Sequence, residues 1–194
     1  MNIREKDKEY IASTYSRFPV LLTEGRGAKV TDADGKTYLD LGSGIGVNIF
    51  GYADAGWTEA VTAQLKKLAH TSNLYFTSPC AELAEALVLR TGMKKVFFCN
   101  SGAEANECAI KAARKWGEEH KSAEHFNIVT LQGGFHGRTL AALAATGQEE
   151  YHKDFLPLTP GFVTVPPADE EALERAGKQN QCAAIMLEPI PGEG

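Results

Sequence analysis

The residues best suited to chemistry are Ser101, Gly102 and Ala103, where an apolar run ends and an alanine-rich amphipathic pattern begins. Ser101 can cap the helix that this pattern predicts, and Glu104 follows at the capping-box spacing. The first turn of a helix has unpaired N–H groups and the positive end of the helix dipole, so it favours anions. Gly102 lacks a Cβ, which lets an anion approach its backbone. The junction predicts a phosphate site or, alternatively, an ordinary capped helix with no ligand.

Two further segments, residues 133–138 and 188–194, contain side chains with chemical potential after short apolar runs. Phe135 presents a flat ring that can lie on a planar heteroaromatic ligand. Arg138 presents a fork that suits a carboxylate or a phosphate. Glu188 follows a predicted buried strand, where a carboxylate needs a partner or a function. Taken singly, the alternatives are a core phenylalanine, a surface arginine and a glutamate bonded to local backbone.

From residue 93 onward, short apolar runs alternate with helical patterns, which predicts an α/β fold with a parallel sheet. The expected strands, buried on both faces, are residues 95–99, 126–131, 162–165 and 183–187. Ligands of such sheets gather outside the carboxyl ends of the strands, so the three chemical segments should meet at one rim. Small residues spaced by three and four after Gly102 are expected to face the sheet: Ala105, Cys108, Ala109, Ala112, Ala113 and Trp116.

The first part of the chain has a different character. Asp34-Gly35 predicts a β-hairpin in which both central residues adopt positive φ. Residues 42–48 contain too many glycines for a regular element and suggest a close backbone approach. Helices are expected at about 57–69 and from Ser78 to about Arg90.

The composition indicates a globular protein, with 43% hydrophobic residues and a net charge of −5. Scattered basic residues argue against a nucleic-acid surface, and no apolar run has the length of a membrane span. The charged N-terminus does not resemble a signal peptide, so a cytoplasmic location is expected. The spacing of the cysteines suits neither a metal site nor a disulfide framework, so no metal is expected. The cysteines should instead be reduced core residues: Cys80, Cys99, Cys108 and Cys182. Cys99 in particular is expected to be a buried thiol.

Together, these segments resemble the class III (ornithine-type) aminotransferases, which are pyridoxal-phosphate enzymes of fold type I. The resemblance rests on motifs in family order at residues 100–107, 134–140 and 188–194, supported by residues 32–40 and 44–48. It implies an N-terminal antiparallel unit, residues 1–45, that is part of the small domain. Residues 46–194 would then be an incomplete large domain, with part of its mostly parallel sheet and flanking helices.

The resemblance also implies roles for individual residues. Ser101, Gly102 and Ala103 at the helix terminus would bind the cofactor phosphate. Phe135 would stack on the pyridine ring, and Glu188 would lie near the cofactor. Arg138 would pair with the α-carboxylate of the substrate, helped by Tyr15. Glu193 matches the gating carboxylate of the family, which swings aside so that 2-oxoglutarate can bind.

Within the family, residues 135–140 and 44–48 are most similar to the acetylornithine branch. The ornithine branch typically has a tyrosine at the position of Gly44, so glycine would leave room for an N-acylated donor. The resemblance therefore implies transfer of the δ-amino group of N2-acetylornithine to 2-oxoglutarate, as in arginine biosynthesis, by a protein that is a homodimer when full length. Succinylornithine, ornithine and 4-aminobutyrate are the alternative donors.

The family's Schiff-base lysine is expected beyond Gly194, because no lysine of this chain has the family's sequence context. Lys111 and Lys115 are expected to be solvated helix residues. The chain is thus interpreted as the N-terminal portion of a transaminase that is inactive alone. The alternative is a separate phosphate-binding or interaction module. A sheet without its later strands would expose an apolar edge, so poor solubility is also expected.

Overall fold

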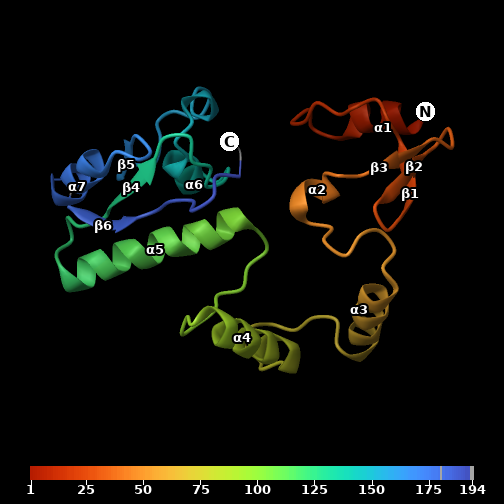
Figure 1. Cartoon of the computed structure of the whole chain (residues 1–194), viewed down its shortest axis with the longest axis horizontal. Coiled ribbons are helices and arrows are strands. Elements are labelled where there is room, and N and C mark those ends of the chain that lie inside the picture. The colour runs from red at the N-terminus through yellow and green to blue at the C-terminus, as the bar shows by residue number, and fades with distance from the viewer. Residues whose placement is uncertain (180, 193–194) are drawn as a thin grey trace. The chain divides into compact units, whose positions relative to one another are not determined.

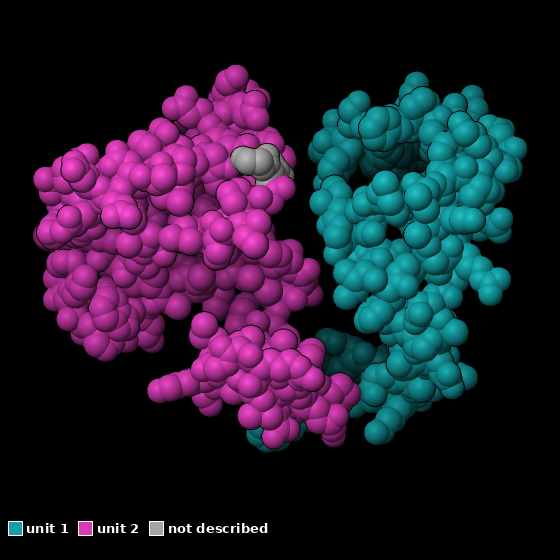
Figure 2. Space-filling view, viewed as in Figure 1, with its two compact units in different colours: residues 1–77 teal, residues 78–194 magenta. Residues whose placement is uncertain are grey.

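The computed structural model describes residues 1–179 and 181–192 and divides into two compact units, Met1–Thr77 and Ser78–Gly194 (Figures 1 and 2). The first unit contains an antiparallel sheet and the second a parallel sheet. Within the described residues, no helix combines the length and apolar character that crossing a membrane requires.

In the first unit, the strands form an antiparallel sheet in the order β1-β2-β3. The predicted helix at about 57–69 is confirmed as α3, which begins where the Asp54 side chain accepts a hydrogen bond from Trp57 N at 2.7 Å. The elements in chain order are α1 (Ile3–Tyr10), β1 (Leu22–Arg26), β2 (Lys29–Asp32), β3 (Thr37–Leu39), α2 (Ser43–Gly46) and α3 (Ala55–Lys67).

The predicted hairpin is present between β2 and β3, but only Gly35 of its two central residues has a positive φ, 81°. The Asp32 carbonyl accepts a hydrogen bond from Gly35 N at 3.0 Å, which places the turn corners at Ala33 and Asp34. The Asp32 carboxylate accepts from the N–H groups of Asp34 and Lys36 at 3.0 and 2.9 Å. The turn is therefore a tight turn followed by a glycine bulge, and Asp34 needs no left-handed conformation.

The Asp32 carboxylate should make the hairpin sensitive to acid. The Tyr38 hydroxyl, which donates to it at 2.7 Å, and the two backbone donors hold the pKa of Asp32 below its ordinary value despite burial. A lowered pKa means that this contribution is fully present above the unfolded value of about 3.9 and is lost as pH falls through the lowered pKa. We expect the Asp34 and Lys36 amide signals in NMR spectra to shift in that range, and at higher pH in Tyr38→Phe. Identical titrations would contradict this account.

Residues 43–46 form one left-handed turn, α2, with φ of 47°, 63°, 60° and 74°. Left-handed backbone costs a non-glycine residue about 1–2 kcal/mol, so the strain falls on Ser43 and Ile45. A Cβ built at Gly44 or Gly46 would meet nothing within 4 Å in the described part of the chain. Gly44 and Gly46 therefore serve backbone conformation here, and no described atom makes the expected close approach to them.

In the second unit, β4 lies between β5 and β6 and pairs with both in parallel, which confirms the predicted parallel α/β pattern. The helix predicted from Ser78 is confirmed as α4, and three of the predicted strands are present. The elements are α4 (Ser78–Thr91), α5 (Gly102–His120), β4 (Asn127–Leu131), α6 (Leu140–Ala145), the 3-10 turn η1 (Glu149–Tyr151), β5 (Phe162–Val165), α7 (Glu170–Gln179) and β6 (Cys182–Ile185).

Helices cover both faces of this sheet, with α5 and α6 on one side and α7 on the other (Figure 1). Ile128 of β4 packs with Ile110 of α5, whereas the next residue, Val129, packs with Ala176 of α7. The alternation is the period of two that a strand imposes on its side chains. Of the three strands, β4 is well buried, whereas β5 and β6 are only partly covered, which corrects the expectation of burial on both faces.

The strand predicted at residues 95–99 is wrong, because this run pairs with no other described segment. An extended run becomes a strand only when a neighbour accepts and donates its backbone hydrogen bonds. The apolar side chains of the run stay accessible, and Phe97 is 62% exposed. The predictions of a buried Cys99 thiol and of a core Cys80 are also wrong, because both side chains are exposed.

Helix α5 contacts the sheet through a face that overlaps the predicted stripe at Ala113 but is centred on other residues. Ile110 and Gly117 are its buried residues, and Ile110 lies in a cluster with Ile128 and Ala145. Small residues lie on several sides of this helix, so their spacing did not determine its rotation. Ile110 decides it, because burying the larger apolar side chain gains more free energy. Four members of the predicted stripe are exposed instead: Ala105, Ala109, Ala112 and Trp116.

A side chain at position 117 should force α5 away from the sheet. A Cβ built at Gly117 would lie 2.0 Å from the carbonyl oxygen of His125 and 3.1 Å from the Cβ of Ala183. We expect Gly117→Ala to lower the free energy of unfolding by about 3 kcal/mol, the upper end of the usual cost of overpacking. Gly177→Ala in α7 is the matched control, because a Cβ there meets no described atom within 4 Å. Urea unfolding curves in which both variants lose the same stability would refute the prediction.

Candidate functional site

Helix α5 is capped by Ser101, whose Oγ accepts a hydrogen bond from Glu104 N at 3.2 Å. The Glu104 carboxylate turns back and accepts from the side-chain and backbone nitrogens of Asn100 at 3.1 and 2.8 Å. These donors hold the pKa of Glu104 below its ordinary value. The N–H groups of Gly102 and Ala103 have no acceptor in the described part of the chain, as expected for a first helical turn. The helix terminus therefore presents two free backbone amides. One of them belongs to Gly102, which has no side chain to hinder the approach of a ligand.

The loop after β4 is fixed by backbone hydrogen bonds to the segment that follows α6. Gly133 N donates to Gly147 O at 3.0 Å, and Gly147 N donates to Gly134 O at 2.9 Å. Gly133 has a φ of 79°, which lets the chain turn sharply where β4 ends. The loop is thus held firmly enough to orient the side chains that follow.

The same loop packs against the start of α5. The Asn106 side chain donates to the His136 carbonyl at 2.7 Å, and the Thr139 hydroxyl donates to the Glu107 carboxylate. A Cβ built at Gly137 would lie only 2.9 Å from the Cβ of Ala103, so the approach requires glycine. Residues 136–139 therefore pack against the first turns of α5, with Gly137 against Ala103, one of the two residues with a free amide.

Glu188, three residues after β6, also contacts this loop. Its Oε2 accepts a hydrogen bond from Phe135 N at 2.9 Å. The three segments expected at one rim of the sheet therefore meet there, and the loop that contains Phe135 connects the other two. The convergence forms even though the run before α5 is not a strand.

Arg138 lies over aromatic rings at this rim. Its guanidinium carbon is 5.7 Å from the centroid of Phe135 and 4.4 Å from that of Tyr151. The two rings meet edge to face, with centroids 6.2 Å apart. Contacts of this kind contribute about 0.5–1 kcal/mol each at exposed sites and orient the guanidinium. Tyr151 was not anticipated, because nothing in its local sequence marks it.

His136 is the buried member of the loop, with 4% of its surface exposed. The backbone N–H of His136 donates to Thr146 Oγ1 at 3.0 Å. Burial lowers the pKa of the imidazole, and the negative charge of Glu188 opposes that shift. His136 and Asn106 lie within the motifs at residues 134–140 and 100–107, but the sequence alone assigns neither residue a role.

Two predicted site residues, Tyr15 and Glu193, remain predictions. Tyr15 lies in the first unit, where its ring is exposed and the Arg17 guanidinium lies 6.0 Å from its centroid. Glu193 lies outside the described residues. No group of three or more potential metal ligands occurs among the residues that the structure describes.

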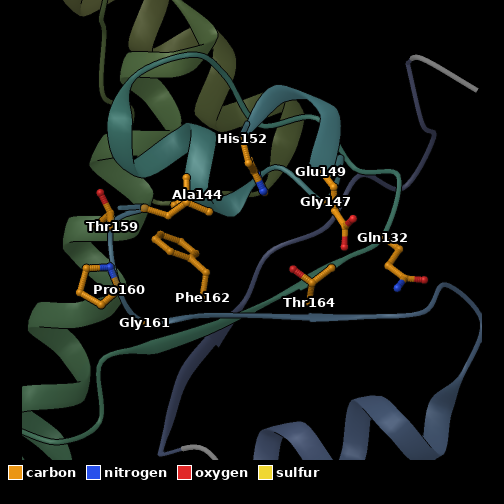
Figure 3. Close-up of a pocket in the computed structure, with 11 residues that line it drawn as sticks. Gln132, Ala144, Gly147, Glu149, His152, Thr159, Pro160, Gly161, Phe162 and Thr164 are labelled. Carbon is orange, nitrogen blue, oxygen red and sulfur yellow. The ribbon is translucent and has the colours of Figure 1, made fainter. Parts of the chain in front are cut away.

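A pocket of about 600 Å³ lies beside β5, and none of the predicted site residues lines it (Figure 3). The Phe162 ring points into it, and His152 Nε2 lies 2.9 Å from the carbonyl oxygen of Leu143 at its wall. Gln132 and Gly147, which line the pocket, border the loop of the candidate site.

Comparisons with known proteins agree with this arrangement. The chain matches the aminotransferase class-III family over residues 10–194. It is 50% identical to an acetylornithine aminotransferase of Haemophilus ducreyi over 99% of this chain and 49% of that protein. It is 49% identical to an acetylornithine aminotransferase of Methanocaldococcus jannaschii over 97% of this chain and 47% of that protein. The chain therefore spans about half the length of the curated relatives it matches.

Solved structures give the same result. The ornithine aminotransferase of Toxoplasma gondii superposes with a TM-score of 0.90 at 30% identity, covering 97% of this chain and 45% of that one. A transaminase from the marine bacterium Virgibacillus superposes with a TM-score of 0.87 at 27% identity, covering 96% and 47% of the two chains. By motif order, fold and similarity, this chain belongs to the class III aminotransferases, and its fold is that of the fold type I pyridoxal-phosphate enzymes.

Proposed function

We propose that this chain supplies the cofactor-phosphate and substrate-carboxylate contacts of an acetylornithine aminotransferase. The reaction is transfer of the δ-amino group of N2-acetylornithine to 2-oxoglutarate. One observation carries the proposal: the free amides of Gly102 and Ala103 lie beside a loop that also holds an aromatic ring and an arginine. Phosphate, heteroaromatic ring and carboxylate are the groups that such a set recognises.

The helix terminus suits the phosphate of pyridoxal phosphate. The amides of Gly102 and Ala103 would donate to its oxygens, and Ser101 would contact it. Space is available, because a Cβ at Gly102 would meet nothing within 4 Å in the described part of the chain. The positive end of the α5 dipole would add to the attraction. Inorganic phosphate should compete for the same amides.

Phe135 would lie on the pyridine ring, and Glu188 would hold Phe135 in place. The support for Glu188 is its hydrogen bond to Phe135 N, which fixes the backbone from which the ring extends. Pyridoxal phosphate, when bound, supplies an electron sink for the substrate carbanion. The proposal gives no lysine of this chain the Schiff-base role, and Lys95, Lys111 and Lys153 are all exposed.

Arg138 would pair with the α-carboxylate of the amino donor. Its guanidinium is exposed, and cation–π contacts with the rings of Tyr151 and Phe135 orient it. A guanidinium fork can bind a carboxylate through two parallel hydrogen bonds. In the same proposal Tyr15 assists the donor, and Glu193 is the gating carboxylate.

N2-acetylornithine is favoured as donor by the relatives at 45–50% identity, which are named acetylornithine aminotransferases. Gly44 also agrees with a bulky donor, because nothing described lies within 4 Å of a Cβ built there. We also propose that the protein assembles as a homodimer.

A chimera tests the proposal, since this chain covers half of its relatives. The full chain replaces the matching half of the Haemophilus ducreyi acetylornithine aminotransferase, with that unmodified enzyme as control. Glutamate formation from 2-oxoglutarate is measured with N2-acetylornithine, N2-succinylornithine, ornithine and 4-aminobutyrate, and light scattering gives the oligomeric state. We expect the highest kcat/KM with N2-acetylornithine in a dimer. A folded chimera that prefers another donor would refute N2-acetylornithine as the substrate. A folded chimera without transamination would refute the proposed function.

A further inference from the structure

Helix α6 is capped by a residue of α5. Thr139 is the N-cap of α6 by position, but its side chain makes no capping hydrogen bond to the first turn of the helix. The hydroxyl instead donates to Oε1 of Glu107, and the same oxygen accepts from Ala142 N at 3.4 Å. Ala142 N is an amide that a threonine N-cap normally binds with its own side chain. Glu107 therefore takes the place of the missing cap.

The loop before α6 is bound to α5 at two points, and Arg138 lies between them. Glu107 binds the hydroxyl of Thr139, the residue after Arg138. Asn106, the neighbour of Glu107 in α5, donates from its side chain to the His136 carbonyl at 2.7 Å. A carboxylate also suits the start of α6, because the positive end of a helix dipole favours negative charge.

Gly137 shows how closely the two helices approach at this place. A Cβ built there would lie 2.9 Å from the Cβ of Ala103 in α5 and 3.0 Å from the Cβ of Ala142 in α6. The backbone that leads into Arg138 therefore fits between the helices only while they keep their present separation. Because Glu107 joins α6 to α5, it also maintains that separation.

We infer that Glu107 is a positioning residue, which fixes the backbone of Arg138 by joining the start of α6 to α5. The rings of Phe135 and Tyr151 orient the guanidinium, whereas Glu107 sets the point from which the side chain extends. A guanidinium fork makes two parallel hydrogen bonds to a carboxylate only in one geometry, so its origin matters. The effect of Glu107 on donor binding rests on the proposed function, whereas the link between the helices does not.

Substitutions in α5 separate this link from simple packing. Glu107→Met keeps the length and the helix propensity of the side chain but has no acceptor oxygen. Glu107→Gln keeps an acceptor oxygen and removes the charge. Glu118→Met is the matched control, because Glu118 is an exposed residue of the same helix outside the site. Helix α6 should persist in Glu107→Met, since the freed Thr139 hydroxyl can then cap Ala142 N in the usual way.

Relaxation of backbone ¹⁵N nuclei in the cofactor-free full chain measures the order of the Arg138 amide. We expect an order parameter of about 0.85 in the wild type and in Glu118→Met, and a fall toward about 0.6 in Glu107→Met. Glu107→Gln should stay close to the wild type. Thr139→Val, which removes only the hydroxyl, should also lower the order parameter, so the test does not depend on one variant. An Arg138 amide that stays equally ordered in Glu107→Met and Thr139→Val would overturn the inference.

The chimera tests whether Glu107 acts through Arg138. We expect Glu107→Met to lower kcat/KM for N2-acetylornithine about tenfold, the equivalent of one hydrogen bond, mainly through a higher KM. In the Arg138→Gln background the same substitution should cost less than about twofold, because residues that act through one contact are not additive. A tenfold loss in both backgrounds would overturn the inference. If no donor is transaminated while Arg138 loses order in Glu107→Met, the proposed function fails and the link between the helices stands.

Discussion

Gly102→Asp is expected to weaken the binding of pyridoxamine 5′-phosphate to the full chain by roughly 100-fold or more. The new carboxylate would occupy the open space beside the free amides of Gly102 and Ala103, where the phosphate is proposed to bind. Two unit charges about 4 Å apart at a protein surface interact with about 4 kcal/mol, more than a 100-fold loss requires. Isothermal titration calorimetry measures the change.

Gly102→Asn is the matched control, because asparagine has the size of aspartate without its charge. Neither substitution should destabilise α5, since acidic residues are favoured in a first helical turn and glycine is a poor helix former. Thermal unfolding monitored by circular dichroism verifies this. We expect Gly102→Asn to bind the ligand far more tightly than Gly102→Asp. Equal affinities would show that charge at this terminus has no effect and that the phosphate binds elsewhere.

Arg138→Gln is expected to lower kcat/KM for N2-acetylornithine in the chimera by about 100-fold, because a hydrogen-bonded charge pair contributes about 1.5–3 kcal/mol. Glutamine keeps polarity and length but removes the positive charge and the fork. The affinity for pyridoxamine 5′-phosphate should change little, since the cofactor contacts are assigned to other residues. Initial rates and binding are compared in the same preparation.

Arg175→Gln is the control for this measurement. Arg175 is an exposed arginine of α7 that pairs with Glu171 at 3.3 Å and lies outside the proposed site. It should leave kcat/KM unchanged. If Arg138→Gln behaves like Arg175→Gln, Arg138 does not bind the donor carboxylate. If Arg138→Gln instead abolishes cofactor binding, the arginine serves the phosphate.

The sequence predicted the parallel sheet well because its strands are short apolar runs bounded by turns. The run at residues 162–165 coincides with β5 at both ends, and the run at 126–131 with β4 to within a residue. The run at 95–99 has the same composition but forms no strand. The composition of a run describes only that run, whereas the presence of a partner strand depends on the whole sheet.

Side-chain environments were harder to predict than elements. The capping of α5 followed from Ser101 and Glu104, which lie close in sequence. The rotation of α5 did not, because it depends on where Ile110 and Gly117 meet distant strands. The contact between Phe135 and Glu188 spans 53 residues, so only the topology of the sheet could bring them together. Local patterns thus indicated the chemistry of the site, and long-range packing decided its geometry.

The most direct test of the central claim compares the binding of pyridoxamine 5′-phosphate and of pyridoxamine to the wild-type full chain. The two ligands differ only in the phosphate, which is the group assigned to Ser101, Gly102 and Ala103. The account predicts that the phosphorylated ligand binds at least about 100-fold more tightly, as expected when charged hydrogen bonds to one group dominate, and that inorganic phosphate displaces it. Equal binding of the two ligands, or no binding of either, would contradict the account.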